Sequence, residues 1–331
     1  MTRIAVDGYG GDYAPEQIVE GALQAADMYG IPIYLTGDEK RLKPLVDGKA
    51  GSSLIEIVHA PEVITMDEAP VEAVRKKKQS SLVAAAELVR NKQAQAFVSA
   101  GSTGATMAAS LFVIRRIKGV ERPAITSLMP TSKGVCLMVD VGANVDSRPS
   151  HLVQFAQMGS VYAEHVLHIP NPRVGLLNVG QEPGKGNQLV QSVYPLLEEL
   201  PLNFVGNIEG RDIPRGDVDV VVCDGFVGNV VLKFAEGLGA SLFGMMKEEF
   251  TSTFSSKVGA LLLKPGLKRI KKRMDYTEYG GAPLLGVQGV SIVAHGGSNA
   301  KAIRNAIRAA KEGVDNKIVD IIEEMMVPSG R

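Results

Sequence analysis

Serine, threonine and glycine gather in one short stretch, QAFVSAGSTGAT (95–106), where an apolar run of strand length enters a turn. A helix of small residues is expected to follow. Glycine allows a ligand to approach the backbone closely, and a helix N-terminus presents N–H groups and a positive dipole to an anion. We therefore predict an anion site here, although an ordinary turn capped by hydroxyl groups has the same composition. Its binding residues would be Ser99, Gly101, Ser102, Thr103 and Gly104.

Turns of the same character follow several other apolar runs, among them DGYGGD (7–12), DVGANVD (140–146), NVGQEPGKGN (178–187), CDGFVGN (223–229) and AHGGSN (294–299). Carboxylates in such turns could orient hydrogen-bond donors or accept a proton, and asparagine could contact a polar ligand. Each of these residues could instead cap a turn or a helix. The catalytic candidates are Asp7, Asp12, Lys185, Asp224 and His295, and the further binding candidates are Asp140, Asn144, Asn187 and Asn229.

Two of these candidates have distinctive neighbours. Glycine flanks Lys185 on both sides, which predicts a mobile loop that closes a cation over a ligand. The alternative is a solvated loop lysine. His295 stands at a strand end, directly before a helix rich in lysine and arginine, which would place it in the same cleft. The other histidines are expected on the surface or as satisfied core residues.

The elements that must position these turns follow a simple alternation. Ten apolar segments of strand length are separated in many places by stretches of helical period, such as 15–30 and 81–93. This pattern predicts a three-layer α/β/α sandwich with a mostly parallel sheet and right-handed crossovers. The strand ends would then form one edge, where ligands bind. We expect residues 1–331 to form a single α/β unit with a helical excursion at about 237–278.

Composition excludes several classes of protein. Lysine plus arginine equals aspartate plus glutamate at 36 each and tryptophan is absent, so a nucleic-acid surface is not expected. No Cys/His spacing predicts a metal, and no turn matches a dinucleotide fingerprint or a P-loop, so we expect no cofactor. Cys136 and Cys223 lie in apolar runs, which predicts that both are small buried residues. This cysteine usage fits a protein of the reducing cytoplasm. The N-terminus lacks a leader pattern and no long uninterrupted apolar segment follows, which predicts neither secretion nor membrane spanning.

The segment SSKVGALLLKPGLKRIKKRMDY (255–276) combines an apolar tip with a basic helix. Such a pairing is typical of a monotopic membrane anchor or of a docking patch for an acidic carrier protein. A helical dimer contact with a solvated basic face is the alternative, and the uses are compatible. The contact residues would be Leu261, Leu262, Leu263, Lys268, Arg269, Lys271 and Lys272.

The sequence resembles the PlsX family, the bacterial phosphate acyltransferases. The resemblance is carried from residue 3 to about 310 by DGYGGDYAP, EAVRKKKQSS, SAGSTGA, RIKGVERPA, DVGANVD, LLNVGQEPGKGN, DGFVGN, YGGAPLLG and AHGGSNAKA. It implies a homodimer with a fold like that of isocitrate and isopropylmalate dehydrogenases and phosphate acetyltransferases. It also implies long-chain acyl-ACP and inorganic phosphate as substrates. The acyl phosphate would pass to a membrane acyl-phosphate:glycerol-3-phosphate acyltransferase, so the protein would be cytoplasmic and peripherally attached to the inner face of the membrane.

Several positions depart from the family pattern. The first turn usually reads Asp-Ala-Met-Gly-Gly-Asp, often followed by His, whereas this chain has Gly8, Tyr9 and Tyr13 at the variable places. A histidine base is therefore absent there. Ser102 replaces the usual asparagine and Val227 the common threonine.

Phosphorolysis of a thioester agrees with these residues. Phosphate is largely dianionic near neutrality and attacks the carbonyl itself, so no protein nucleophile is required. Positioning can supply roughly 7 kcal/mol and an oxyanion donor about 3 kcal/mol. A nicotinamide-dependent decarboxylating dehydrogenase is the enzymatic alternative, but no arginine cluster with paired metal aspartates is identified. A noncatalytic lipid-surface adaptor could use 255–276 alone, yet it would have no use for the polar strand ends.

Overall fold

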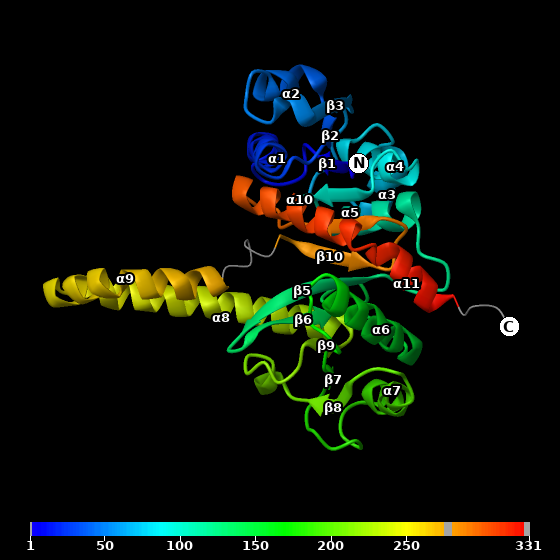
Figure 1. The fold of residues 1–331 in the computed structure, drawn as a ribbon, viewed down its shortest axis with the longest axis vertical. Helices are drawn as coiled ribbons and strands as arrows, with labels where there is room; N and C mark the ends of the chain where they lie inside the picture. The colour runs from blue at the N-terminus through cyan, green and yellow to red at the C-terminus, as the bar shows by residue number, and fades with distance from the viewer. Residues whose placement is uncertain (1, 275–279, 328–331) are drawn as a thin grey trace.

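A computed structural model describes residues 2–274 and 280–327, with the backbone alone at 271–274. It contains a single eleven-stranded sheet with helices on both faces, from which a pair of long helices projects (Figure 1). The strand order is β3-β2-β1-β4-β11-β10-β5-β6-β9-β7-β8. The strands are β1 (Ile4–Asp7), β2 (Ile33–Gly37), β3 (Ile55–His59), β4 (Ala96–Ser99), β5 (Ala124–Thr131), β6 (Gly134–Val139), β7 (Val174–Leu177), β8 (Phe204–Ile208), β9 (Val220–Val222), β10 (Ala282–Leu285) and β11 (Val290–Val293).

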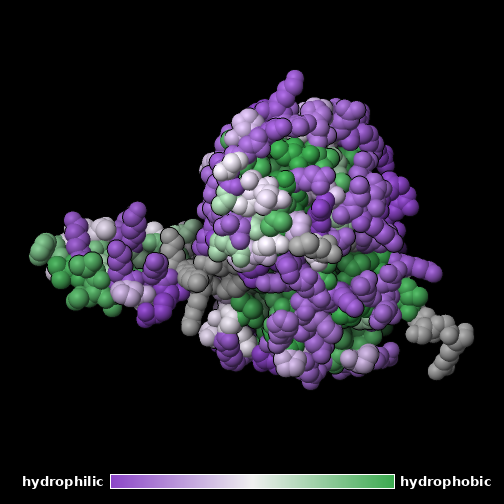
Figure 2. Space-filling view, turned by 45° about the horizontal axis from the view of Figure 1, so that its top comes forward, coloured by the Kyte–Doolittle hydropathy of each residue, from purple (hydrophilic) through white to green (hydrophobic). Residues whose placement is uncertain are grey.

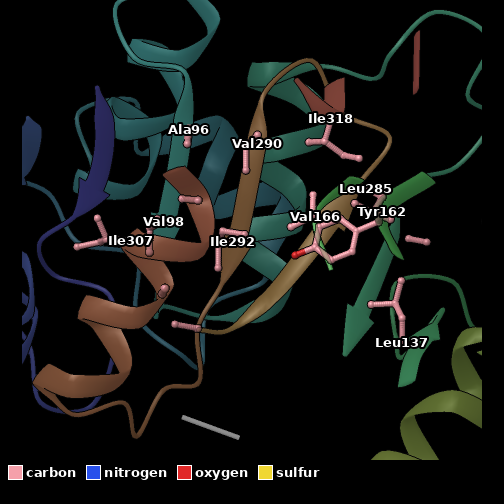
Figure 3. Close-up of a cluster of buried hydrophobic side chains, with 14 of the residues drawn as sticks. Ala96, Val98, Leu137, Tyr162, Val166, Leu285, Val290, Ile292, Ile307 and Ile318 are labelled. Carbon is pink, nitrogen blue, oxygen red and sulfur yellow. The ribbon is translucent and has the colours of Figure 1, made fainter. Parts of the chain in front are cut away.

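Helices form the two outer layers because alternate strand residues point to opposite faces of the sheet. Val98 joins one buried cluster, with α1, α6, α7, α10 and α11, whereas Phe97 joins the other, with α3, α4 and α5. Figure 3 shows part of the first cluster, where Ile307, Tyr162 and Ile318 pack on the central strands. The helices are α1 (Glu16–Tyr29), α2 (Glu39–Val46), α3 (Pro70–Lys76), α4 (Ser81–Arg90), α5 (Thr103–Ala109), α6 (Pro149–His165), α7 (Gln188–Glu198), α8 (Gly225–Ser252), α9 (Phe254–Met274), α10 (Ala300–Asp315) and α11 (Ile318–Met326).

The three-layer α/β/α architecture predicted from the sequence is confirmed, but one strand was missed. The segment APLL forms β10, between β11 and β5, and it is antiparallel to both. Its four residues include Pro283, a residue that weakens a strand pattern because it cannot donate a ladder hydrogen bond. The neighbouring strands β5 and β6 form an antiparallel hairpin rather than a crossover unit.

Strand direction reverses across the middle of the sheet. Strands β1, β2, β3, β4 and β11 are mutually parallel, and so are β6, β9, β7 and β8. Three antiparallel pairings separate the two groups, and an odd number of reversals turns the second group opposite to the first. The prediction that all polar strand ends share one edge is therefore wrong. The sequence shows where each strand ends, but not the direction in which it enters the sheet.

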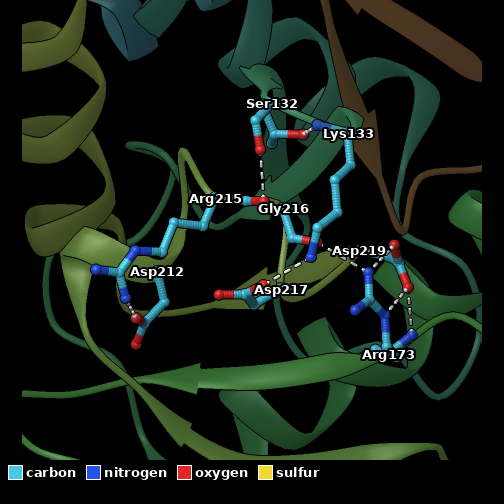
Figure 4. A network of polar contacts seen from close by, with 9 residues as sticks. Ser132, Lys133, Arg173, Asp212, Arg215, Gly216, Asp217 and Asp219 are labelled. Atoms are coloured by element: carbon cyan, nitrogen blue, oxygen red, sulfur yellow. Dashed lines mark hydrogen bonds and ion pairs between the residues drawn. The ribbon is translucent and has the colours of Figure 1, made fainter.

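Ion pairs fix the part of the sheet that holds β7 and β9. The guanidinium of Arg173, at the start of β7, donates to both carboxylate oxygens of Asp219, before β9, at 2.9 and 3.0 Å. Lys133, in the β5–β6 turn, pairs with Asp217 at 2.8 Å, and Ser132 donates to the carbonyl of Arg215 (Figure 4). These contacts hold the starts of β7 and β9 and the β5–β6 turn together. Several predicted site residues follow the opposite ends of β6, β7 and β9, so the contacts help to fix the strands that carry them.

The projecting helices α8 and α9 pack against each other and leave most of their surface exposed. Hydrophobic residues gather at the far end of this pair (Figure 2). Helix α8 is the one helix in the described ranges that is long and apolar enough to cross a membrane. However, its first turn is buried against the sheet at Gly225 and Gly228, so we interpret α8 as a surface projection of the α/β unit.

Candidate active site

The turns after β1 and β4 are joined through two buried side chains. Ser99 donates a 2.8 Å hydrogen bond to the Asp7 carboxylate, and these residues are only 1% and 2% exposed. The carboxylate also accepts from the backbone N–H of Tyr9, and the Ser99 hydroxyl accepts from the N–H of Gly101 at 3.0 Å. Burial raises the pKa of Asp7, against the lowering effect of these hydrogen bonds. Asp7 and Ser99 are thus occupied in shaping the turns.

The N-terminus of α5 is open beside these turns. Ser102 is the N-cap, but its side chain does not cap the helix, and helix geometry leaves the first N–H groups without intrahelical partners. Thr103 is exposed and Ser102 is half-buried, so both hydroxyls remain accessible. At Gly104 the helix passes close to Pro70, since an added Cβ would lie 2.7 Å from the proline ring. The predicted binding residues at 99–104 are therefore brought together at the start of α5.

Asp12 and His295 lie on either side of the glycine pair after β11. The N–H of Asp12 donates to the carbonyl of Gly296 at 2.8 Å, and His295 Nδ1 accepts from the N–H of Gly297 at 3.0 Å. A Cβ on Gly296 would lie 3.5 Å from both carboxylate oxygens of Asp12. Both side chains are exposed, so the structure brings them together at the edge that also carries Asp7 and Ser99.

A second group of predicted residues forms at the ends of β6 and β9, on the opposite edge. Asp140 is fully buried, and its carboxylate accepts from the N–H groups of Ile125, Gly142, Ala143 and Asn144. The side-chain amide of Asn144 adds a fifth hydrogen bond at 2.9 Å. Burial raises the pKa of Asp140 and the hydrogen bonds oppose that shift. Asp140 is therefore the centre of a turn and not an open ligand.

The start of α8 packs directly on this turn. Asp224 caps the helix by accepting from the N–H groups of Phe226 and Val227, both at 3.0 Å. An added Cβ on Gly228 would lie 1.9 Å from the Asp140 carbonyl oxygen, so only glycine fits there. Asn229 lies beside Gly142, whose added Cβ would be 3.6 Å from the Asn229 amide carbon. The structure thus brings Asp140, Asn144, Asp224 and Asn229 together.

Lys185 and Asn187 lie in the loop between β7 and α7, the next strand of the same group. Asn187 is the N-cap of α7, where its side chain accepts from the N–H of Val190 at 3.0 Å. Lys185 is exposed, but the loop around it is tied down by three side-chain amides that the sequence analysis missed. They belong to Asn178, Gln191 and Asn207. In the sequence, only the polar composition of NVGQEPGKGN indicated a role for Asn178. Asn207 lies on another strand, β8.

The predicted membrane or carrier contact lies on α9, far along the projecting pair. Leu261, Leu262 and Leu263 are 67%, 77% and 56% exposed, and Lys268 and Arg269 are exposed as well. Consecutive helical residues are about 100° apart, so the three leucines point in different directions. The side chains of Lys271 and Lys272 lie outside the described part of the structure.

Two other features bear on the choice of site. Within residues 2–274 and 280–327, no three His, Cys, Asp or Glu side chains gather as metal ligands would. A surface groove of about 460 Å³ lies between β3 and α4, and its lining includes His59, Lys78 and Glu87. None of the residues predicted from the sequence lines this groove. The two groups of strand-end residues therefore remain the candidate active site.

Comparison with known proteins gives one consistent result. The family described as "Fatty acid synthesis protein" matches residues 2–320. The phosphate acyltransferase of Desulfitobacterium hafniense (strain Y51) is 56% identical over 325 residues, which cover 98% of this chain and 97% of that protein. The matched range contains both groups of strand-end residues.

Solved structures with the same fold are much more distant in sequence. A phosphotransacetylase from Streptococcus pyogenes aligns with a TM-score of 0.66 and 18% identity over 95% of this chain and 94% of that one. A 4-hydroxythreonine-4-phosphate dehydrogenase from Klebsiella pneumoniae aligns with a TM-score of 0.54 and 12% identity over 96% of this chain and 100% of that one. These likenesses show the fold alone, and they confirm the predicted resemblance to the folds of phosphate acetyltransferases and dehydrogenases.

Proposed function

This chain belongs to the fatty acid synthesis protein family, and from that premise we propose that it transfers a long-chain acyl group from an acyl-carrier-protein thioester to inorganic phosphate. Acyl transfer to phosphate is the activity of its curated relatives. The acyl carrier, the chain length and the acyl phosphate product are the new parts of this proposal. The open N-terminus of α5 is the observation that carries it, because uncapped helix donors beside accessible hydroxyls suit a phosphate ion.

The reaction requires no covalent enzyme intermediate. An oxygen of hydrogen phosphate attacks the thioester carbonyl, and a carbon–oxygen bond forms as the carbon–sulfur bond breaks. The electron pair leaves with sulfur, and the proton released by phosphate ends on the thiolate. Charges and atoms balance, since hydrogen phosphate and thioester give acyl phosphate and thiol. The residues need only hold the reactants, stabilise the oxyanion and guide that proton.

At the first group, we propose that phosphate sits on the N–H groups and hydroxyls of Ser102 and Thr103 with the Gly101 and Gly104 backbone. Asp7 and Ser99 act by shaping the turns beneath it, as their mutual hydrogen bond supports. Asp12 and His295, exposed on the neighbouring turns, would guide the proton.

At the second group, we propose that Lys185 and Asn229 contact the thioester or the phosphate. Asp140, Asn144, Asp224 and Asn187 support the proposed contacts as turn centres and helix caps. The two groups end on opposite edges of the sheet, so the effects of Thr103→Val and Lys185→Ala on the kinetics with phosphate test whether both groups act on one substrate.

The decisive assay mixes the enzyme with phosphate and palmitoyl-ACP and traps acyl phosphate with hydroxylamine. Trapping should depend on enzyme, phosphate and ACP thioester together, and absence of trapped product would overturn the proposal. Thr103→Val should raise KM for phosphate about tenfold, the effect of losing one hydrogen bond to a charged ligand. Ser192→Ala, which removes an exposed hydroxyl on α7, is the control.

The role of Lys185 is tested in the same assay. Lys185→Ala should lower kcat/KM for phosphate, whereas Lys43→Ala, on the exposed face of α2, should not. If both lysine variants keep normal kcat/KM for phosphate, Lys185 has no part in the mechanism.

We also propose that α8 pairs with a second copy of the chain. Exposed apolar residues recur at every fourth position of this helix, and the resemblance of the sequence implies a homodimer. Phe234→Glu should reduce the dimer in sedimentation, whereas Val205→Glu on edge strand β8 should not. A dimer unaffected by Phe234→Glu would exclude this face. The exposed residues are Phe226, Val230, Phe234, Leu238 and Leu242, at 60%, 53%, 68%, 47% and 47%.

Peripheral membrane binding is the last part of the proposal. The exposed leucines and cations of α9 would insert at the headgroup level of an anionic membrane on its cytoplasmic face. There the membrane acyl-phosphate:glycerol-3-phosphate acyltransferase could receive the product. Flotation with anionic vesicles should fall for Leu262→Glu and weaken with salt. It should persist for Leu196→Glu, a matched change at an exposed leucine of α7, and equal flotation of both variants would overturn the contact.

A further inference from the structure

Four carbonyl groups of the loop between β7 and α7 are occupied by side-chain amides. Asn207 Nδ2 donates to the carbonyl of Glu182 at 2.9 Å, and Asn178 Nδ2 donates to the carbonyl of Lys185 at 3.0 Å. Gln191 Nε2 donates to the carbonyls of Gly184 and Gly186, both at 3.0 Å. The side-chain amides therefore hold the backbone of every residue from Glu182 to Gly186 except Pro183.

The backbone within this loop forms a tight turn. The N–H of Lys185 donates to the carbonyl of Glu182 at 3.0 Å, with Pro183 and Gly184 in the central positions. Proline presets the backbone angle that the first central position of such a turn requires. Asn207 donates to the same carbonyl from β8, and its side chain is buried, so the turn is fastened to the sheet.

Two glycines allow the close contacts that position Lys185. At Gly186, where φ is +96°, an added Cβ would lie 2.3 Å from the Asn178 side-chain oxygen, so the close contact that ties the loop requires glycine. At the buried Gly180, an added Cβ would lie 3.3 Å from Lys185 Cγ. The stem of the lysine thus rests on Gly180 while its ammonium group stays in solvent.

The amide of Asn207 is costly in another respect. In the described residues its side-chain oxygen is buried without a hydrogen-bond partner, although its nitrogen is paired. A buried acceptor with no partner destabilises a protein, and an apolar side chain of similar size would avoid that cost. The hydrogen bond to the Glu182 carbonyl is the feature that an apolar residue could not supply.

We infer that Asn178, Gln191 and Asn207 are positioning residues that hold Lys185 in place before substrate arrives. The inference rests on the proposed function, in which Lys185 contacts phosphate or thioester. It replaces the picture of a mobile Gly-Lys-Gly loop with a fastened turn that fixes the backbone from which the lysine side chain extends. A loop held in advance loses little backbone freedom on binding and needs no closure.

The main test uses Gln191→Met, which keeps the length of an exposed side chain and removes both donated hydrogen bonds. Gln188→Met, on the first helical residue of α7, is the matched control. Gln191→Met should lower kcat/KM for phosphate about 3- to 10-fold, the equivalent of one or two ordinary hydrogen bonds. In a Lys185→Ala background the same change should have no further effect, because the amide acts only through the lysine.

A second measurement is independent of activity. Trypsin cleaves after exposed lysines in mobile segments, so cleavage between Lys185 and Gly186 reports how firmly the turn is held. Native protein should resist at this bond, and Gln191→Met and Asn207→Leu should be cut faster there than Gln188→Met, as followed by mass spectrometry. Unchanged cleavage would overturn the fastened turn whatever the enzyme does.

The remaining outcomes are distinguishable. Faster cleavage with unchanged kcat/KM in Gln191→Met would overturn the positioning role while leaving the turn intact as a structural feature. Equal losses from Gln191→Met in the wild-type and Lys185→Ala backgrounds would show that the amide acts on stability alone. If Lys185→Ala itself is fully active, the proposed role of the lysine fails first and the positioning role fails with it.

Discussion

The hydroxyl of Ser99 donates to the carboxylate of Asp7 at 2.8 Å, and this bond joins the ends of β4 and β1 through two residues that are 92 positions apart in the chain. Both groups are buried, so this contact links the turn after β1 to the turn that leads into α5. A buried carboxylate deprived of a donor keeps its desolvation cost without the compensating bond.

Ser99→Ala should therefore destabilise the protein by about 1–3 kcal/mol, measured by urea unfolding at neutral pH. The N–H of Gly101 also loses its acceptor in this variant, so KM for phosphate should rise as the turn loosens. Ser192→Ala is the exposed hydroxyl control. A Ser99→Ala protein with unchanged stability would show that the buried contact contributes nothing.

The contribution of Asp7 to the stability of the fold depends on pH, and the sign of this dependence follows from its pKa. Burial raises the pKa of Asp7 above its usual 3.8, so the folded state takes up this proton more readily than the unfolded state. The Asp7 carboxyl therefore favours folding at low pH, and this contribution is lost as pH rises through the folded pKa. Because Ser99 lowers the pKa of Asp7, Ser99→Ala should raise it further, as carbon-13 NMR titration of the carboxyl would show.

A second pH effect concerns the segment that leads into α3, the helix whose Pro70 lies close to Gly104 of α5. Glu68 accepts from Lys77 Nζ at 2.7 Å and from the N–H of Thr65 at 2.8 Å, and these bonds lower its pKa to about 2. Since this pKa is depressed in the folded state, the contribution to stability is present above pH 4.5 and lost as pH falls toward 2.

Lys77→Met should return the Glu68 pKa most of the way to its usual value, as NMR titration of the carboxyl would show. Lys76→Met, which removes the neighbouring pair with Glu72, is the matched control and should leave Glu68 unchanged. A Glu68 that titrates normally in the wild-type protein would contradict the contact.

Local features of the site were accessible from the sequence, and distant pairings were not. The capping of α7 by Asn187 involves a residue three positions away, and turn composition predicts such contacts. The bond between Asn207 and Glu182 spans 25 positions, and no spacing rule reveals it. The reversal of strand direction depends on β10, whose proline and four-residue length hid it. The activity was predicted from the resemblance to a family, because a sequence resemblance can be recognised without knowing which strands pair.

The burial of both cysteines leads to a chemical prediction. Burial raises the pKa of Cys136 to about 12 and that of Cys223 well above its usual range. Since the thiolate is the reactive form, neither thiol should react with Ellman's reagent in the native protein at pH 8. Both should react in 6 M guanidinium, roughly the denaturant range in which stable domains unfold. Rapid labelling of a native thiol would show that the sheet opens there.

The close approach of α8 to the Asp140 turn allows the sharpest test of the second group. An added Cβ on Gly228 would lie 1.9 Å from the Asp140 carbonyl oxygen and 3.0 Å from the Cys223 sulfur, and the backbone cannot move aside without breaking the turn. Gly228→Ala should therefore cost at least about 3 kcal/mol or prevent folding.

The same helix offers the control. Gly237 has nothing within 4 Å of an added Cβ, so Gly237→Ala should stabilise α8 by up to about 1 kcal/mol through helix propensity alone. Opposite shifts in urea midpoint for the two variants would separate the close approach from the general effect of alanine in this helix. Equal shifts would mean that α8 does not pack on Asp140, and the placement of Asp224 and Asn229 beside that turn would fall with it.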